Sequence, residues 1–219
     1  MCSHYQGIQG RERFERHFGI APPADAGQAD VWPGYRALFI RNTPPSAASD
    51  ATRLQALSGL FGLVPHWSTD LRMTRSTYNA RSETASEKPS FRSAWRNRQF
   101  GLVLCENFFE PNYETGRAVR WKIERADQQP FGIACLWDRW TDPASGELIV
   151  SFSMLTVNAD EHAVMNQFHK PGDEKRTPVI ISPEYHGDWL GADLADAAAL
   201  MSWQHMPAHA AYPCPRSAV

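Results

Sequence analysis

The chain has 219 residues, 42% of them apolar, and a formal net charge of −2. Its length fits one large domain or two small ones, and its apolar content is sufficient for a real core. No apolar run reaches the roughly 18 residues needed to span a bilayer, and the first residues lack the apolar stretch of a secretory signal. These features argue against a membrane or secreted protein, and we expect one cytoplasmic, monomeric domain over residues 1–219.

The number and spacing of the cysteines also fit a protein of the cytoplasm. The four cysteines are Cys2, Cys105, Cys135 and Cys214. None of them has a neighbour at metal-ligand spacing, and they are too few and too dispersed for a disulfide framework. We therefore expect a reduced protein with no metal and no organic cofactor.

Taken in chain order, the sequence predicts mainly strands. Pro/Ala/Ser/Asp-rich loops are expected at 21–30 and 43–52, and a turn between strands at 141–146. Strands are predicted at 35–41, 100–110 (turning at 106–107), 118–125, 130–137, 147–157 and 177–182. Helices are predicted at 90–98, 158–168, 183–190 and 193–203. From about residue 207 we expect a loosely held tail. Consecutive strands without βαβ regularity indicate an α+β fold with a largely antiparallel, barrel-like sheet.

Cys2 directly follows the initiator methionine. Removal of Met1 would leave one residue carrying both an α-amine and a thiol, with ordinary pKa values of about 7.7–8.0 and about 8.5. The amine can form a Schiff base with an aldehyde, and the thiol can then close a thiazolidine ring. Cys2 is therefore a candidate aldehyde trap or acyl-transfer nucleophile, although a cysteine at this position can also be accidental.

A local positive charge lies between residues 70 and 98. The stretch contains seven basic and three acidic residues, a local charge of +4, with aromatic residues interleaved. Clustered cations bind phosphates and aromatic faces stack on unpaired bases, so the stretch is a candidate surface for single-stranded nucleic acid. The alternative is a solvated helix face.

Three further polar residues are candidates for helping Cys2. Asn79 could hold an adduct, or simply form an Asx turn. Glu110 follows two phenylalanines, where partial burial would raise its pKa towards a useful acid–base value, but it could be a surface residue at a strand end. His169 could shuttle protons, or interact with a helix terminus. His162 lies seven residues earlier, and spacing alone does not choose between the two histidines.

The combination and order of these motifs resemble one family. Cys2 is followed by YNARSET at 78–84, EKPSFR at 87–92, NFFE at 107–110, ACLWDRW at 134–140 and KRTPVII at 175–181. This order resembles the SRAP family, the SOS response-associated peptidases, whose members protect abasic sites in single-stranded DNA. The likeness runs from Cys2 to about residue 190, and its most specific piece is NARSET with the downstream EKPSFR.

The resemblance implies roles for four residues. Cys2 would be the nucleophile that forms a covalent thiazolidine crosslink with the abasic sugar, after self-processing removes Met1. Asn79 would hydrogen-bond the adduct. Glu110 would shuttle protons, and His169 would assist opening of the sugar ring as proton donor.

The resemblance also implies a DNA surface. Arg81 and Arg92 match arginines that grip phosphates, Trp67 matches an aromatic residue near the DNA groove, and Pro33 would share its rim. Arg75 belongs to the same basic stretch. The expected partner is single-stranded DNA with abasic sites, and no membrane contact is expected. Binding to this DNA would place the protein on the nucleoid.

The sequence departs from the family pattern at two places. The motif Gly-Phe-Tyr-Glu-Trp reads Asn-Phe-Phe-Glu-Pro at 107–111, so the packing around Glu110 must differ. A longer charged segment separates His169 from residues 176–178, where Thr177 replaces a methionine.

Two other functions remain open on the residues alone. An amidohydrolase or peptidase with an N-terminal cysteine nucleophile would not need a basic aromatic surface, so DNA affinity separates it. A non-covalent single-strand-binding module would keep its binding in a Cys2→Ala variant.

Overall fold

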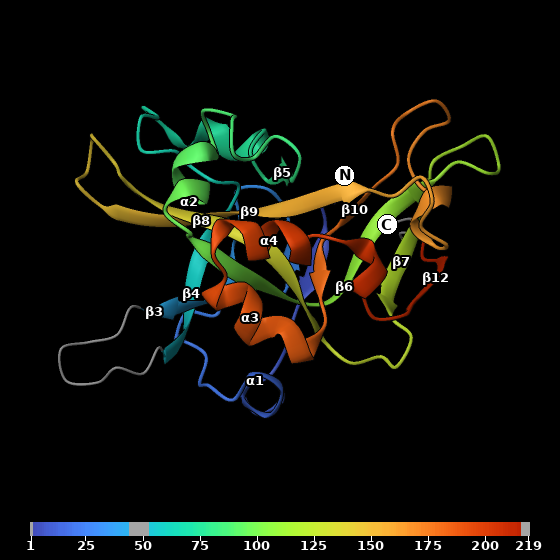
Figure 1. Ribbon diagram of the computed structural model, residues 1–219, viewed down its shortest axis with the longest axis horizontal. Coiled ribbons are helices and arrows are strands. Elements are labelled where there is room, and N and C mark those ends of the chain that lie inside the picture. Colours follow the sequence, from blue (N-terminus) through green and yellow to red (C-terminus); the bar gives the residue numbers. More distant parts are fainter. Residues whose placement is uncertain (1, 44–52, 216–219) are drawn as a thin grey trace.

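Five strands close into a barrel in the computed structural model, which describes residues 2–43 and 53–215 (Figure 1). Around the barrel the order is β3 (Arg36–Thr43), β4 (Arg53–Phe61), β9 (Leu148–Asn158), β8 (Phe131–Thr141) and β6 (Phe100–Asn112), and β6 pairs again with β3. Only the β4–β9 pair in this ring is parallel. The α+β, mainly antiparallel, barrel-like prediction is confirmed. The 44–52 part of the loop expected at 43–52 lies outside the described residues.

Shorter strands extend the barrel. They are β1 (Tyr5–Gly7), β2 (Asp30–Val31), β5 (Asn79–Arg81), β7 (Val119–Arg125), β10 (Arg176–Pro178), β11 (Ile180–Ile181) and β12 (His209–Pro213). The first strand, β1, pairs with β6, and β5 runs parallel to β9. These two pairings bring the chain's first residues and the NARSET segment to the barrel.

The helices are short. The α-helices are α1 (Arg11–Phe18), α2 (Arg92–Arg96), α3 (His186–Gly191) and α4 (Leu194–Leu200), and the 3-10 helices are Leu71–Arg75, Met165–Gln167, Pro183–Tyr185 and Trp203–His205. No helix in the described ranges is long and apolar enough to cross a membrane. Likewise, no group of three or more His, Cys, Asp or Glu in residues 2–43 and 53–215 could hold a metal ion.

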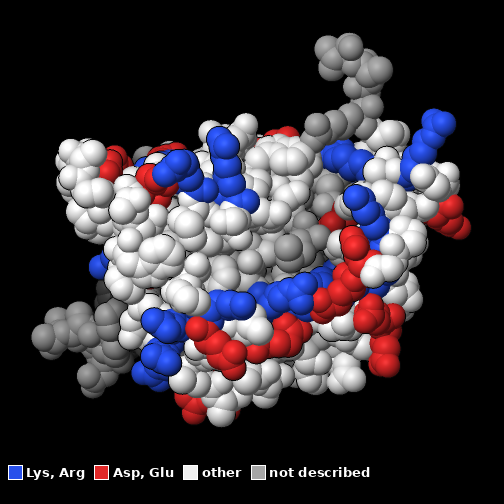
Figure 2. Space-filling model, turned by 90° about the horizontal axis from the view of Figure 1, so that it is seen from above, with Lys and Arg blue, Asp and Glu red and all other residues white. Residues whose placement is uncertain are grey.

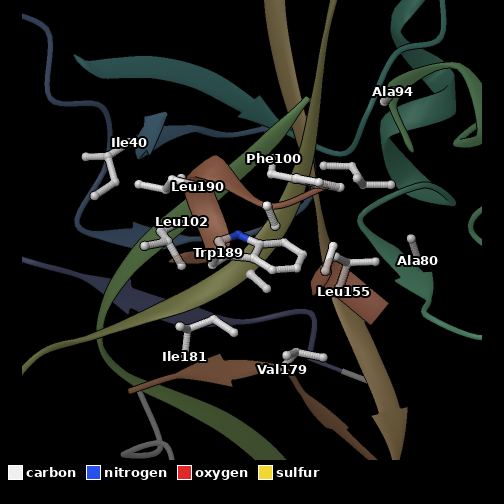
Figure 3. Close-up of a cluster of buried hydrophobic side chains, with 14 of the residues drawn as sticks. Ile40, Ala80, Ala94, Phe100, Leu102, Leu155, Val179, Ile181, Trp189 and Leu190 are labelled. Atoms are coloured by element: carbon white, nitrogen blue, oxygen red, sulfur yellow. The ribbon is translucent and has the colours of Figure 1, made fainter. Parts of the chain in front are cut away.

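Two apolar clusters follow from the alternation of side chains along the strands. Phe39, Val103 and Phe152 belong to a cluster with their neighbours on one face of the closed sheet. The adjacent residues Ile40 and Leu102 belong to the other cluster, which packs against the helices (Figure 3). Apolar side chains therefore pack on both faces of the barrel sheet, and this packing holds the strand ends in fixed positions.

Trp189 is the centre of the outer cluster. It is fully buried, and its indole nitrogen donates a 2.9 Å hydrogen bond to the Gly101 carbonyl (Figure 3). We expect Trp189→Ala to lower the free energy of unfolding by about 3–5 kcal/mol, because it leaves a large cavity. Trp67→Ala, at a side chain that is 48% exposed, should change it by less than about 0.5 kcal/mol. Urea unfolding of both variants measures this, and equal losses would contradict the packing described.

The expected helix at 158–168 is wrong. The segment contains turns and only the 3-10 helix Met165–Gln167. Asn158 and Asp160 hydrogen-bond each other and the local backbone, and Asp160 also accepts from the Lys175 backbone. Side chains of this type compete with helical hydrogen bonds and favour turns, which explains the failure.

Three other expectations also differ from the structure. The predicted turn at 106–107 is a β-bulge, because β6 continues through it and its register with β1 shifts there. The strand at 177–182 divides into β10, paired with β9, and β11, paired with β8. The tail expected to be loose from about 207 contains β12, which pairs along β7. Its last residues, 216–219, lie outside the described ranges.

Candidate functional site

Cys2 is held at one end of the barrel by Asn79. Cys2 is fully buried, and its carbonyl accepts a 2.8 Å hydrogen bond from the Asn79 side-chain nitrogen. Asn79 begins β5, which is placed by pairing with β9, while Cys2 lies just before β1, which is placed by β6. Two residues 77 positions apart therefore meet because separate strands join the same barrel.

Glu110 and His169 lie together at this end. Glu110 is 2% exposed near the end of β6, and its carboxylate oxygen lies 3.6 Å from His169 Nε2. The backbone nitrogen of His169 donates to the Pro111 carbonyl at 3.1 Å. His169 adopts a φ of +67°, a left-handed conformation that is uncommon for a residue with a side chain. The chain thus bends to bring His169 against the strand that carries Glu110.

Burial controls the protonation of these groups. Desolvation raises the pKa of Glu110 from 4.5 to about 7. Burial, together with the charge of Lys175, lowers the pKa of His169 from 6.5 to about 4. Burial also raises the pKa of the Cys2 thiol well above its usual range, and the charge of Glu110 adds to this effect. Near neutral pH the imidazole is neutral, the thiol is protonated, and Glu110 is the group poised to give or take a proton.

A pocket of about 270 Å³ opens beside Glu110. Its wall contains a stack in which the Trp32 and His4 rings lie 3.9 Å apart and the His4 and Phe109 rings 4.4 Å apart. The guanidinium of Arg120 covers the Phe109 ring at 3.4 Å. Arg120 lies opposite Pro111, the residue that replaces the family tryptophan. This stack is the packing next to Pro111 in this chain.

Sequence reasoning missed the residues of this stack and also Tyr78. Burial and the charge of Glu110 raise the pKa of Tyr78. The sequence could have indicated two of these residues only by their positions, since His4 follows Cys2 by two residues and Tyr78 directly precedes Asn79. Nothing in the spacing indicated Trp32 or Arg120.

His162 is separated from the Glu110 pair. It is buried, and its Nδ1 accepts hydrogen bonds of 3.1 Å from the backbone nitrogens of Val164 and Met165. Its ring packs against Trp203 at 5.4 Å. The structure therefore brings His169, and not His162, to Glu110, a choice that the sequence spacing did not make.

The expected DNA-binding residues come from several segments of the chain and differ in their exposure. Trp67 and Arg92 are exposed, and so is Arg75 in the 3-10 helix Leu71–Arg75. Pro33 is half-buried in a loop whose next residue, Gly34, approaches that helix at Thr74. A row of basic side chains crosses one face of the molecule, with acidic side chains bordering it (Figure 2).

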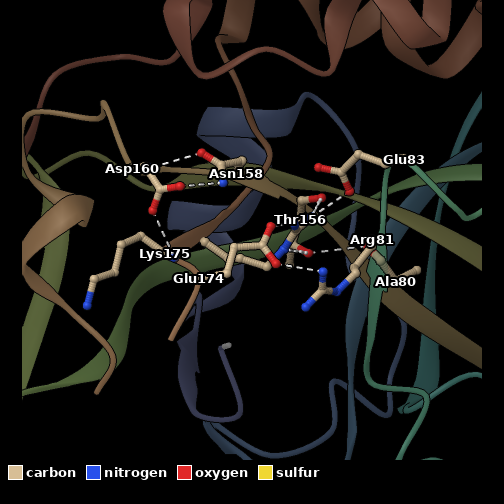
Figure 4. A network of polar contacts seen from close by, with 9 residues as sticks. Ala80, Arg81, Glu83, Thr156, Asn158, Asp160, Glu174 and Lys175 are labelled. Atoms are coloured by element: carbon tan, nitrogen blue, oxygen red, sulfur yellow. Dashed lines mark hydrogen bonds and ion pairs between the residues drawn. The ribbon is translucent and has the colours of Figure 1, made fainter. Parts of the chain in front are cut away.

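Arg81, which the family resemblance assigns to a phosphate contact, is paired with an acidic side chain. Its guanidinium forms a 2.6 Å ion pair with Glu174 (Figure 4). Glu174 also pairs with Arg176 at 2.5 Å, and Arg176, only 2% exposed, makes a further 2.8 Å pair with Glu83. This network fixes NARSET to β10, and it offsets the charge that Arg81 would offer a phosphate.

The family model for the SOS response associated peptidase (SRAP) matches residues 1–217. The chain is 28% identical over 143 residues to the abasic site processing protein YoqW of Bacillus subtilis, covering 65% of this chain and 60% of that protein. It is 24% identical over 174 residues to the abasic site processing protein HMCES of Xenopus tropicalis, covering 66% and 46%. The matches thus span about half to three-fifths of these relatives' length.

A solved structure agrees over nearly the whole chain. A crystal structure of a protein from Bordetella bronchiseptica superposes with a TM-score of 0.84 and 35% identity, covering 98% of this chain and 100% of that one. A structure from Bacteroides thetaiotaomicron, at 23% identity and a TM-score of 0.77, shares the fold over 97% of this chain and 91% of that one. The chain therefore belongs to the SOS response associated peptidase (SRAP) family.

Proposed function

We propose that this protein processes abasic sites in single-stranded DNA by forming a covalent crosslink through Cys2. The observation that carries the proposal is that Asn79 holds Cys2 and Glu110 lies beside His169, while β1, which follows Cys2, pairs with β6, which carries Glu110. Family membership and the names of the curated relatives support the same function. In this proposal the protein is a single, monomeric domain that needs no cofactor, and it acts in the cytoplasm on nucleoid DNA.

The chemistry begins with removal of Met1, which lies outside the described residues. The free α-amine of Cys2 attacks C1′ of the ring-opened abasic sugar, and loss of one water gives an imine. The Cys2 thiol then adds across the C=N bond, with sulfur bonding to carbon and the proton passing to nitrogen. The product is a five-membered thiazolidine.

Each neighbouring side chain has a proposed task. The buried Cys2 thiol is held protonated, so ring closure needs a proton acceptor, and Glu110 with a pKa of about 7 fits that role. Glu110 also participates in the removal of Met1. His169 assists sugar-ring opening beside Glu110. Because the His169 imidazole is neutral near pH 7, the proton for this step comes from the protonated form of Glu110, and the carboxylate left behind can then accept the thiol proton. Asn79 positions the backbone of Cys2.

Denaturing electrophoresis tests this function. The mature protein is incubated with a single-stranded oligonucleotide containing one abasic site, beside the same strand without it. We expect a heat-stable shifted band with the abasic strand alone. A shift with neither strand, together with hydrolysis of an amide substrate, would instead favour the N-terminal-cysteine amidohydrolase. Equal non-covalent retention of both strands in a native gel, with no denaturation-resistant band, would favour the simple binding module.

Arg92 gives a separate prediction about the DNA surface. Its side chain is exposed, and it has no ion pair with any residue in the described part of the chain. Arg92→Ala should weaken single-strand binding and flatten the plot of log affinity against log salt by about one unit. Arg75→Ala should do the same, and Arg81→Ala should flatten it less, because Glu174 already offsets its charge.

The control for this measurement is Arg11→Ala. Arg11 is an exposed arginine on α1 that pairs with Glu15 and belongs to no proposed DNA contact. Fluorescence anisotropy over a salt series measures the slopes. Unchanged slopes in the Arg92 and Arg75 variants would place the DNA on another face.

A further inference from the structure

A second polar pocket, of about 690 Å³, lies far from Cys2 and Glu110. Its walls include Arg41 of β3, Arg98 and Gln99 just before β6, and Trp137 to Arg139 of β8. Glu110 lies ten or more residues further along β6, roughly 30 Å at the usual rise of a strand. In Figure 1, β3 and α2 are labelled at the opposite side of the molecule from the N and C labels. The pocket is therefore distinct from the site already described.

The pocket is strongly basic. Three arginines (Arg41, Arg98 and Arg139) and one acid (Asp138) line it, a net charge of +2. None of the three arginines forms an ion pair with a described residue. Asp138 is already engaged, since its Oδ1 accepts from the Gln99 side chain at 3.3 Å and from the Arg139 backbone at 2.8 Å. The positive charge is thus left for an external anion.

Arg41 is the unusual member of this set. The residue is only 9% exposed, and its guanidinium lies 4.3 Å from the centre of the Trp137 ring. Its Nη2 donates to Gln55 at 2.8 Å, but its buried Nε has no hydrogen-bond partner among the described residues. A buried guanidinium with an unused donor is costly unless an acceptor completes it. Burial and the charge of Arg139 both lower the pKa of Arg41, which again indicates an uncompensated cation.

Arg98 is the second arginine of this pocket. It adopts a φ of +52°, a conformation that costs free energy for a residue with a side chain. Arg98 belongs by sequence to the basic stretch at 70–98, yet its position on this pocket separates it from Glu110. Arg139, which is exposed, also lies beside Trp137, with its guanidinium 5.6 Å from the centre of that ring.

We propose that this pocket binds a phosphate group, held by the guanidinium groups of Arg41, Arg98 and Arg139. Guanidinium groups make paired, charge-assisted hydrogen bonds to phosphate oxygens. The volume is large enough for a nucleotide. Two sources share this chemistry: a free nucleoside monophosphate and a phosphodiester of a DNA strand. The proposal does not depend on the reactivity of Cys2.

Calorimetric titration tests the proposal on the full chain. The probes are inorganic phosphate, deoxycytidine 5′-monophosphate and, as the phosphate-free control, deoxycytidine. For a free-nucleotide source, the monophosphate should bind and deoxycytidine should not. Arg98→Gln and Arg139→Gln should each weaken binding about tenfold or more. Both residues are exposed, so these variants should fold, whereas Arg41→Gln replaces a buried residue. Arg11→Gln should bind normally.

The DNA arm uses an undamaged single strand without a terminal phosphate. For a phosphodiester source, the mononucleotide binds poorly, but the Arg98→Gln/Arg139→Gln double variant loses about two units of salt slope. Arg11→Gln should keep the full slope. Binding of both probes that is unchanged in the double variant would overturn the proposal, and so would the absence of any binding by phosphate, mononucleotide or strand.

Discussion

Cys2→Ser is expected to abolish the heat-stable crosslink with abasic DNA while leaving non-covalent strand binding intact. Serine keeps the α-amine and can still form an imine, but a hydroxyl is a much poorer ring-closing nucleophile than a thiol. The residual adduct should therefore hydrolyse on heating, and be captured only when a hydride reductant is added. Denaturing electrophoresis with and without borohydride measures both products.

The matched control for Cys2→Ser is a chain extended by a few residues ahead of Cys2. This extension keeps the thiol and removes the free cysteine amine, so neither an imine nor a thiazolidine should form. Cys105→Ser removes the thiol of another buried cysteine. This variant tests whether the loss of crosslinking is specific to the thiol at position 2. Normal crosslinking by a permanently extended protein would contradict the aminothiol mechanism.

Glu110→Gln is expected to slow crosslink formation by about 100- to 10,000-fold, the usual contribution of a positioned acid–base group. Glutamine preserves the shape of the side chain but cannot titrate. Reversal of the adduct should slow as well, because the same group moves protons in both directions. Time courses between pH 5 and 9 should show a rate change near pH 7 in the wild type that the variant lacks. The rate change that comes from deprotonation of the Cys2 α-amine, with its ordinary pKa of about 7.7–8.0, should remain in both proteins.

Histidine variants provide the control for Glu110→Gln. His169→Ala should slow formation, because His169 lies 3.6 Å from Glu110. His162→Ala should leave the chemistry unchanged in protein that remains folded, because its ring is engaged with the local backbone. A larger kinetic defect in folded His162→Ala than in His169→Ala, or a normal rate for Glu110→Gln, would overturn the assignment.

The raised pKa of Glu110 also affects stability. Between pH 4.5 and about 7 the unfolded carboxyl loses its proton while the folded one retains it, so the native state binds more protons. Stability of the wild type should therefore fall with rising pH across this window, relative to Glu110→Gln, and the difference should stay constant above it. Urea unfolding of both proteins at several pH values measures this difference.

Much of the barrel could be predicted from alternation and apolar runs. The strands near 35–41, 118–125 and 147–157 and the turn at 141–146 are local features, and the structure contains them. Local patterns failed where side chains or distant partners decide the structure. Asn158 and Asp160 replace a helix by turns, and β12 is a strand only because β7 offers it a paired edge.

The site was less accessible from the sequence than the fold. Alternation cannot show that β5 lies parallel to β9 or that β1 lies on β6, and these pairings bring Asn79, Cys2 and Glu110 to one end. The family resemblance supplied that grouping instead. It did not indicate the ion pair that occupies Arg81 or the ring stack beside Pro111, because both depend on contacts between residues far apart in the sequence.

Intact-mass spectrometry of the crosslinked product tests the central claim most directly. The account predicts the mass of the protein without Met1, plus the oligonucleotide, minus one water, and it predicts that proteolysis places the adduct on Cys2. Borohydride should leave this mass unchanged, because a thiazolidine has no C=N bond to reduce. An adduct on a lysine, or one in which Met1 is still present, would contradict the account.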